Sequence, residues 1–182
     1  MTFDPVLHEY RNGEIIIPSV TQVLKRAGYI DDRWFSEEAR DRGSAVHTLC
    51  ERYCHGIRFD NAGRALASLE YINAFSHFVG DFGAYAIDTE VIVYGEINGH
   101  RYAGKYDIQA EIHGKRVLID IKTGAKAKWH SIQLAAYAMQ INPHSAMDLY
   151  LKADGTYQAS WLTPWQLVEG IRLFRSALIT RS

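Results

Sequence analysis

Three β-rich segments that follow one another in the second half of the chain constrain the fold most. Residues 85–94, 99–111 and 117–122 are rich in β-branched and aromatic residues, as strands typically are. Short turn sequences, Asn98-Gly99 and His113-Gly114, separate them. Asn-Gly and similar pairs between alternating segments indicate tight hairpins. The sequence therefore predicts a three-stranded antiparallel meander.

Helical patterns surround this meander on both sides. Before it come a hairpin at residues 7–17 around Asn12-Gly13 and then three helices; the helices are expected at residues 19–28, 36–53 and 62–78. After it come a helix over 130–140, two short strands over 147–152 and 156–161, and a final helix that Thr163 caps. Strands grouped together between helices favour the α+β class, with one mixed β-sheet flanked by α-helices. No linker divides the chain, so we expect a single domain over 1–182, with 1–83 built onto a core at 84–182.

The composition is that of a globular protein, with 47% hydrophobic and 23% charged residues. No apolar run approaches the ~20 residues that a membrane helix needs, and the start of the chain lacks the features of a signal peptide. We therefore expect a cytoplasmic protein with no membrane partner. Cys50 and Cys54, which are the two cysteines, are expected to be reduced and buried.

Positive charge gathers in one stretch although the net charge is −1. Between His100 and His130 there are seven lysines and arginines against three acids. Such a stretch suits a site that holds both cations and a polyanion. An ordinary solvated surface explains the same count equally well.

The residues with the strongest chemical signal are Asp107 and, thirteen positions later, Asp120 and Lys122. Strand alternation places Asp120 and Lys122 on one face, with Ile121 on the other. On an adjacent antiparallel strand, Asp107 comes close to Asp120. Two carboxylates with a lysine form a site for a hard divalent cation, Mg²⁺ or Mn²⁺. The alternative is ordinary surface pairing, but the apolar run 117–119 predicts a buried strand, where charges are costly unless they belong to a site.

These residues belong to a larger ordered set. Gly104-x-x-Asp107, Asp120-x-Lys122-Thr-Gly and Gln133-x-x-x-Tyr137 occur in this order, with a histidine upstream at the end of residues 42–47. The set resembles the PD-(D/E)XK nuclease superfamily and, within it, the RecB-like branch. Residues 18–24 further resemble the start of small phage- or prophage-encoded members, so the matches together span about residues 8–137. The resemblance implies a restriction-endonuclease-like core. It also implies a metal-dependent DNA nuclease, an exonuclease in phage or prophage recombination, replication or repair.

The resemblance also implies roles for single residues. It makes Asp107 and Asp120 metal ligands together with the backbone carbonyl of Ile121, and it makes Lys122 the catalytic lysine. His47 would complete the metal shell, although a lone helical histidine is more often structural. Glu90 is a further candidate ligand or supporting acid.

Other residues are candidates for DNA contact or support of the site. Gln133 and Tyr137 share one helix face, which the resemblance directs toward the site or the DNA backbone; a core tyrosine beside an exposed glutamine is the alternative. The segment after Lys122 offers small residues, Lys126, Lys128 and Trp129 for phosphate contacts and base stacking. Trp129 would equally pack against the helix that follows. Arg42 lies in the segment that carries the histidine.

Several features of relatives are missing from the sequence. RecB-like proteins with an iron–sulphur cluster use four cysteines, whereas this chain has two, so no cluster is expected. No Walker-type phosphate loop is present, and a motor would have to come from a partner. DNA is the expected ligand, and a recombination or single-strand-binding protein is a candidate partner. A non-catalytic nucleic-acid-binding module and an RNA-directed nuclease are the rival functions.

Overall fold

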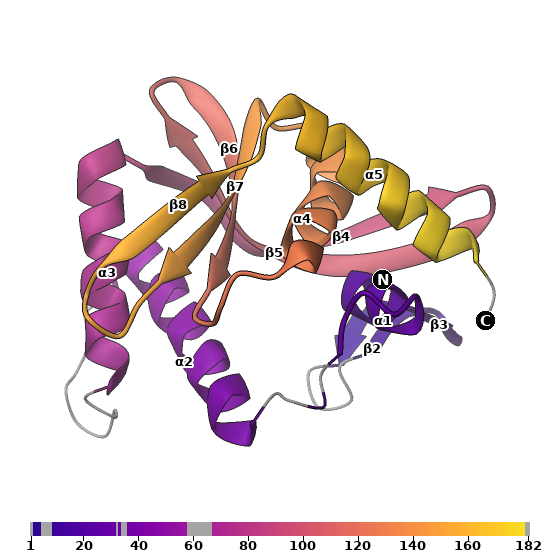
Figure 1. The fold of residues 1–182 in the computed structure, drawn as a ribbon, viewed down its shortest axis with the longest axis horizontal. Helices are drawn as coiled ribbons and strands as arrows, with labels where there is room; N and C mark the ends of the chain where they lie inside the picture. Colours follow the sequence, from indigo (N-terminus) through magenta and orange to yellow (C-terminus); the bar gives the residue numbers. More distant parts are fainter. Residues whose placement is uncertain (1, 5–8, 32, 34–35, 58–66, 181–182) are drawn as a thin grey trace.

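A five-stranded mixed sheet forms the centre of the molecule in a computed structural model, which describes residues 2–4, 9–31, 33, 36–57 and 67–180 (Figure 1). Its strands lie in chain order: β4 (Tyr85–Ile97), β5 (His100–Ile112), β6 (Lys115–Lys122), β7 (Ser145–Leu151) and β8 (Tyr157–Trp161). All neighbours are antiparallel except β6 and β7, which are parallel. The predicted meander and the α+β class are confirmed.

The two tight turns of the meander follow from their sequences. Asn98 and Gly99 both have positive φ angles, 51° and 78°, and His113 and Gly114 repeat this with 50° and 73°. Two consecutive left-handed residues define the type I′ turn, whose twist matches that of the flanking strands. Asparagine and glycine adopt this conformation at low cost.

Helices cover both faces of the sheet (Figure 1). They are α1 (Val20–Arg26), α2 (Glu37–Cys54), α3 (Ala67–Phe82), α4 (Lys128–Ile141) and α5 (Pro164–Ile179). The hydroxyls of Ser19 and Thr163 accept backbone hydrogen bonds at the starts of α1 and α5, in capping boxes. Residues 62–66 of the predicted third helix lie outside the described residues, and α3 extends four residues beyond the predicted end.

Two apolar cores separate the helices into two groups. In β6, Leu118 packs with α1, α4 and α5, whereas Ile119 and Ile121 pack with α2 and α3. This is the alternation expected of a central strand with both faces covered. The parallel step from β6 to β7 requires a crossover connection, and α4 provides it.

The alternation breaks at one point of β5. Tyr106 belongs to the core beneath α1, α4 and α5, but Ile108, two residues later, belongs to the core beneath α2 and α3. On the neighbouring strand, Glu90 has a φ of 53°, which is uncommon for a residue with a side chain. The ladder to β6 stops at the pair Ile108–Ile119. Asp107 therefore lies where the β4–β5 ribbon turns away from the rest of the sheet.

A smaller sheet precedes these elements. It consists of β1 (Thr2–Asp4), β2 (Glu9–Asn12) and β3 (Ile15–Ile17) in the order β1-β2-β3. The predicted hairpin corresponds to β2 and β3; its residues 7 and 8 lie outside the described residues, and β1 was not predicted. A backbone hydrogen bond from Ala103 to the carbonyl of Pro18, 3.0 Å long, joins this region to β5.

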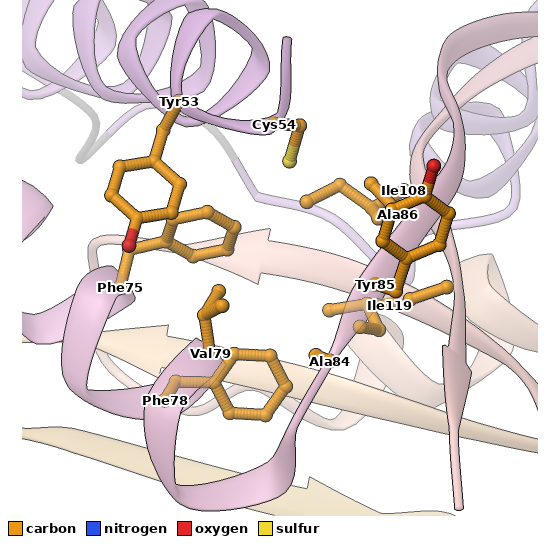
Figure 2. A pocket seen from close by; sticks show the side chains of 11 residues that line it. Tyr53, Cys54, Phe75, Phe78, Val79, Ala84, Tyr85, Ala86, Ile108 and Ile119 are labelled. Carbon is orange, nitrogen blue, oxygen red and sulfur yellow. The ribbon is translucent and has the colours of Figure 1, made fainter. Parts of the chain in front are cut away.

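A partly open apolar hollow of about 170 Å³ lies under α2 and α3. Figure 2 shows Phe75, Phe78 and Val79 of α3 on one side of it and Ile108 and Ile119 of the sheet on the other. No acid lines it, so it plays no part in the chemistry below.

The two cysteines are free thiols, with Cys50 buried and Cys54 half-buried beside the hollow. Burial raises the pKa of the Cys54 thiol to about 11, which leaves it protonated and unreactive at neutral pH. Among the described residues, no helix is both long and apolar enough to span a membrane.

Candidate active site

The predicted site residues gather at the end of β6, between α2 and α4. A cleft of about 520 Å³ opens there. Its wall includes Arg42, Gly43 and His47 of α2, Ile121 and Lys122 of β6, and the loop that follows. Asp107 and Asp120 are buried behind this wall.

Within the part of the chain that the structure describes, one group of side chains could hold a metal ion: His47, Glu90 and Asp107, whose ligand atoms lie within 4.8 Å of one another. The His47 Nδ1 atom is 3.2 Å from Asp107 Oδ1 and 3.9 Å from Glu90 Oε1. On the other side of the ring, Nε2 is 3.1 Å from the carbonyl oxygen of Ile121. The backbone N–H of Ile121 donates to Asp107 Oδ2 over 2.6 Å. Residues of three strands and one helix thus surround the His47 ring, with the two carboxylates at Nδ1 and the Ile121 carbonyl at Nε2.

A backbone irregularity of β4 lies at this cluster. Glu90 has a φ of 53° and lies opposite Asp107, between the pairs Thr89–Ile108 and Val91–Tyr106. A residue held in this conformation costs about 1–3 kcal/mol. Such conformations cluster at functional sites.

The protein's own cations balance these acids. Burial alone would lower the pKa of His47, but the adjacent Asp107 carboxylate raises it to about 9. Burial likewise favours protonated Asp107, yet the charges of His47 and Lys122 hold its pKa below the usual value. Burial raises the pKa of Glu90, although Lys105 forms an ion pair with it. The cluster is therefore a place where positive charge is strongly stabilised.

The second part of the site is the pair of Lys122 and Asp120. The ammonium group contacts Asp120 Oδ2 and donates to Gln133 Oε1 of α4 over 2.8 Å. Gln133 in turn donates to the hydroxyl of Tyr137 over 3.2 Å. The predicted face of α4 thus contacts the lysine, and both of its residues are buried, so they support the site and do not face solvent.

The charge states in this pair differ from those of free side chains. Burial raises the pKa of Asp120 to about 6, an effect that Lys122 partly opposes. Burial would lower the pKa of Lys122, but the carboxylates of Asp120 and Asp107 raise it above its ordinary value. Lys122 is therefore a cation at neutral pH despite its low exposure.

Gly104 allows the helix and the sheet to come this close. A β-carbon at this position would lie 2.5 Å from Cε1 of Tyr137 and 3.3 Å from Cγ2 of Val20. The first distance is too short for any real contact. The glycine of the Gly-x-x-Asp motif is thus explained by packing, because it lets the Tyr137 ring lie against β5.

The remaining candidates lie around the cleft at different depths. Arg42 and Lys126 line it, and the Lys126 ammonium donates to Ser160 Oγ over 2.8 Å. The prediction that Lys128 and Trp129 lie in the loop before the helix is wrong. Both belong to the first turn of α4. Trp129 faces the site, with the Lys122 ammonium 5.2 Å from its ring centre, a cation–π distance. Lys128 instead lines a neighbouring pocket.

Two charged residues near the site were not predicted. Lys105, which pairs with Glu90, lies inside the Gly-x-x-Asp motif but had no assigned role. Asp148 of β7 pairs with Asp120 in the parallel register, and only 2% of it is exposed. An acid within the apolar run 146–151 was the available signal for it.

The residues present fit a hard divalent ion. Carboxylates, one imidazole and a backbone carbonyl are suitable donors for Mg²⁺ or Mn²⁺. The His47 Nδ1 atom lies 3.2 Å and 3.9 Å from the carboxylate oxygens of Asp107 and Glu90, near enough for these groups to bind one ion. Asp120 is engaged with Lys122 and borders this group without belonging to it.

Comparison with known proteins places the fold but not the family. The sequence matches no protein-family model and no curated protein. Among solved structures, a candidate exonuclease from Eubacterium rectale superposes with a TM-score of 0.57 at 16% identity, over 88% of this chain and 77% of that one. SSO0001 gives 0.48 at 18% identity over 95% and 80%, and LHK-Exo, in complex with dAMP, gives 0.46 at 16% over 90% and 86%. The chain therefore shares the fold of the Eubacterium rectale protein.

Proposed function

We propose that this chain is a divalent-metal-dependent DNA nuclease. The observation that carries the proposal is the meeting of His47, Glu90 and Asp107 beside a buried, charged Lys122. The fold shared with a candidate exonuclease supports it. A charged lysine and several carboxylates are costly to bury together, and such groups in a cleft are typical of an active site.

Mg²⁺ or Mn²⁺ would be held by His47, Glu90, Asp107 and the carbonyl of Ile121, with Asp120 beside them. When bound, the ion supplies Lewis-acid polarisation of the scissile phosphate and lowers the pKa of a water molecule. Binding requires His47 to lose the proton that Asp107 stabilises.

Lys122 has the role of placing a fixed positive charge next to the phosphate. Asp120 keeps it protonated, and Gln133 fixes the direction of the ammonium group. A preorganised cation stabilises the negative charge that develops on phosphate oxygens during hydrolysis. Arg42 and Lys126 lie on the cleft wall, where they would contact neighbouring phosphates.

We further propose that the substrate is DNA and that the enzyme is an exonuclease. It would act in phage or prophage recombination, replication or repair, and would be of the RecB-like kind within the PD-(D/E)XK superfamily. A recombination or single-strand-binding protein is the proposed protein partner. The rival functions are a non-catalytic nucleic-acid-binding module and an RNA nuclease.

The test is digestion of end-labelled linear DNA and closed circular DNA with Mg²⁺, with Mn²⁺ and with EDTA. An exonuclease degrades the linear form alone and only with metal. Lys122→Ala should lower the rate at least 100-fold, the size of effect seen when one transition-state donor is removed. Lys115→Ala is the matched control, since this exposed lysine begins the same strand.

The outcomes separate the rival functions. Equal rates for the wild type and Lys122→Ala would refute the assigned site. DNA binding without cleavage under every condition would favour the binding module, and cleavage of RNA alone would favour the RNA nuclease. Loss of circular DNA at the rate of linear DNA would identify an endonuclease.

A further inference from the structure

A second pocket lies next to the active-site cleft, between α4, α5 and the β7–β8 pair. Its volume is about 530 Å³, within the range of about 300–1,000 Å³ typical of small-molecule sites. Lys126 and Ala127 line both this pocket and the cleft. A ligand in the pocket would therefore lie one lysine away from the proposed position of the scissile phosphate.

A buried carboxylate lies at the base of this pocket. Asp148 is 2% exposed, and its Oδ1 atom has no hydrogen-bond partner among the residues that the structure describes. A buried acceptor without a donor costs about 1–3 kcal/mol, so such groups call for an explanation. A ligand in the pocket that donates a hydrogen bond to Asp148 would provide that explanation.

The other walls suit a flat, partly apolar ligand that carries a phosphate. Leu162 and Leu173 provide apolar surface. Trp165, which is 72% exposed, offers an uncommitted indole at the mouth. Lys126 and Lys128 lie at the rim, where a phosphate would meet their ammonium groups.

The acids of the pocket are not equivalent. Glu169 also lines it but forms an ion pair with Arg172, in which the guanidinium donates to both carboxylate oxygens at 2.7 Å. Asp148 faces Ser160 across the β7–β8 ladder, and Ser160 accepts its hydrogen bond from Lys126. Lys126 is thus hydrogen-bonded to the residue that lies opposite Asp148 on β8.

We infer that this pocket binds a nucleobase of the DNA strand, one with an exocyclic amino group that donates to Asp148 while its ring stacks on Trp165. The inference rests on the proposed function for its substrate class. Guanine, cytosine and adenine carry such a group, whereas thymine does not. A base held here would position the strand whose phosphate lies beside Lys122, and it would give the enzyme a preference among bases.

Binding can be measured without cleavage, in EDTA, by calorimetric titration with dGMP, dCMP, dAMP and dTMP. The three amino-bearing nucleotides should bind at least about fivefold more tightly than dTMP, the effect expected of one hydrogen bond. Asp148→Ala should remove this difference. Trp165→Ala should weaken all four about 5- to 100-fold, the range for loss of one stacking aromatic ring.

Trp161→Ala is the matched control, because this tryptophan pairs with Met147 on the opposite face of the sheet and contacts Phe82. It should leave all four affinities unchanged. The same comparison with non-cleavable oligo-dC and oligo-dT tests whether the pocket takes a base of a strand. Oligo-dC should bind more tightly, and Asp148→Ala should abolish its advantage.

Equal affinity for all four nucleotides, or a preference that survives Asp148→Ala, would overturn the inference. A preference among mononucleotides that is absent with the oligonucleotides would overturn the assignment to the strand. None of these measurements requires cleavage. An inactive protein with the expected base preference would support the base-binding pocket and refute only the proposed nuclease activity. An active nuclease without that preference would refute only the base-binding pocket.

Discussion

Replacement of Asp148 by asparagine should make the protein more stable, and more so as the pH rises. Burial raises the pKa of this carboxyl from 3.8 to about 7, and the charge of Asp120 on the paired strand adds to the effect. At pH 8 the folded protein therefore carries a buried charge. Asparagine has nearly the same shape and no charge to desolvate.

The sign follows from linkage. The folded-state pKa lies above the unfolded value, so the stabilising effect of the bound proton is complete below pH 3.8 and is lost as the pH rises to about 7. The span from 3.8 to 7, at about 1.4 kcal/mol per pH unit, gives an upper limit of about 4 kcal/mol. Between pH 5 and pH 8, the stability gained on substitution should grow by up to about 2.6 kcal/mol.

The assay is urea unfolding of the wild type and Asp148→Asn at half-unit pH steps from 5 to 8.5, in EDTA. All other titrating groups are common to the two proteins, so the difference between the two free energies of unfolding reports this carboxyl together with its interaction with Asp120. Glu111→Gln, at an exposed position of β5, controls for the removal of an acid as such. A difference that stays flat with pH, or an asparagine variant that is less stable at pH 8, would refute the reasoning.

Three further predictions concern the site. Gly104→Ala should lower the free energy of unfolding by about 1–3 kcal/mol through overpacking against Tyr137. Gly124→Ala, with open space around the glycine, should change this free energy little. Equal effects of the two substitutions in urea unfolding would contradict the packing argument. Tyr137→Phe removes the acceptor for Gln133 and should lower kcat severalfold with KM nearly unchanged, so an altered KM alone would count against it. Addition of 10 mM MgCl2 should stabilise the wild type by about 1–2 kcal/mol if this concentration is about ten times the Kd for magnesium. It should not stabilise Asp107→Asn. Equal shifts in Tm for the two proteins would place the metal elsewhere.

The sheet could be predicted well because its signals are local. Turn pairs at 98–99 and 113–114 and an uninterrupted apolar run at 117–119 determine strand ends and burial without knowledge of the rest of the fold. The same alternation that directs Ile121 into one core places Asp120 and Lys122 on the opposite face. The pairing of β6 with β7 required only that a helix separate them.

The contacts that complete the site could not be predicted, because they depend on distant residues and on a backbone irregularity. Nothing in the segment 85–94 signals that Glu90 takes a left-handed conformation. Its contact with His47 joins a strand to a helix some forty residues earlier, and its ion pair with Lys105 joins two strands. The start of α4 was placed late because Lys128 and Trp129 follow small residues typical of a loop, whereas a neutral His130 ring accepts the backbone N–H of Ala127 at the helix start.

The arrangement of charge across the sheet connects the site with the neighbouring pocket. Asp120, Asp148 and Ser160 occupy paired positions on β6, β7 and β8, so the two acids lie in one row with Lys122 and Lys126 beside it. The charge of Asp120 raises the pKa of Asp148, and burial raises the pKa of both carboxyls, so this row destabilises the fold at neutral pH. A folded protein tolerates such a cost only where the surrounding structure provides for it, and here two well-packed cores do so. If the two proposals hold, a metal ion at Asp107 and a base at Asp148 would offset part of this cost. Asp148 should then govern both the stability of the free protein and its response to a bound base.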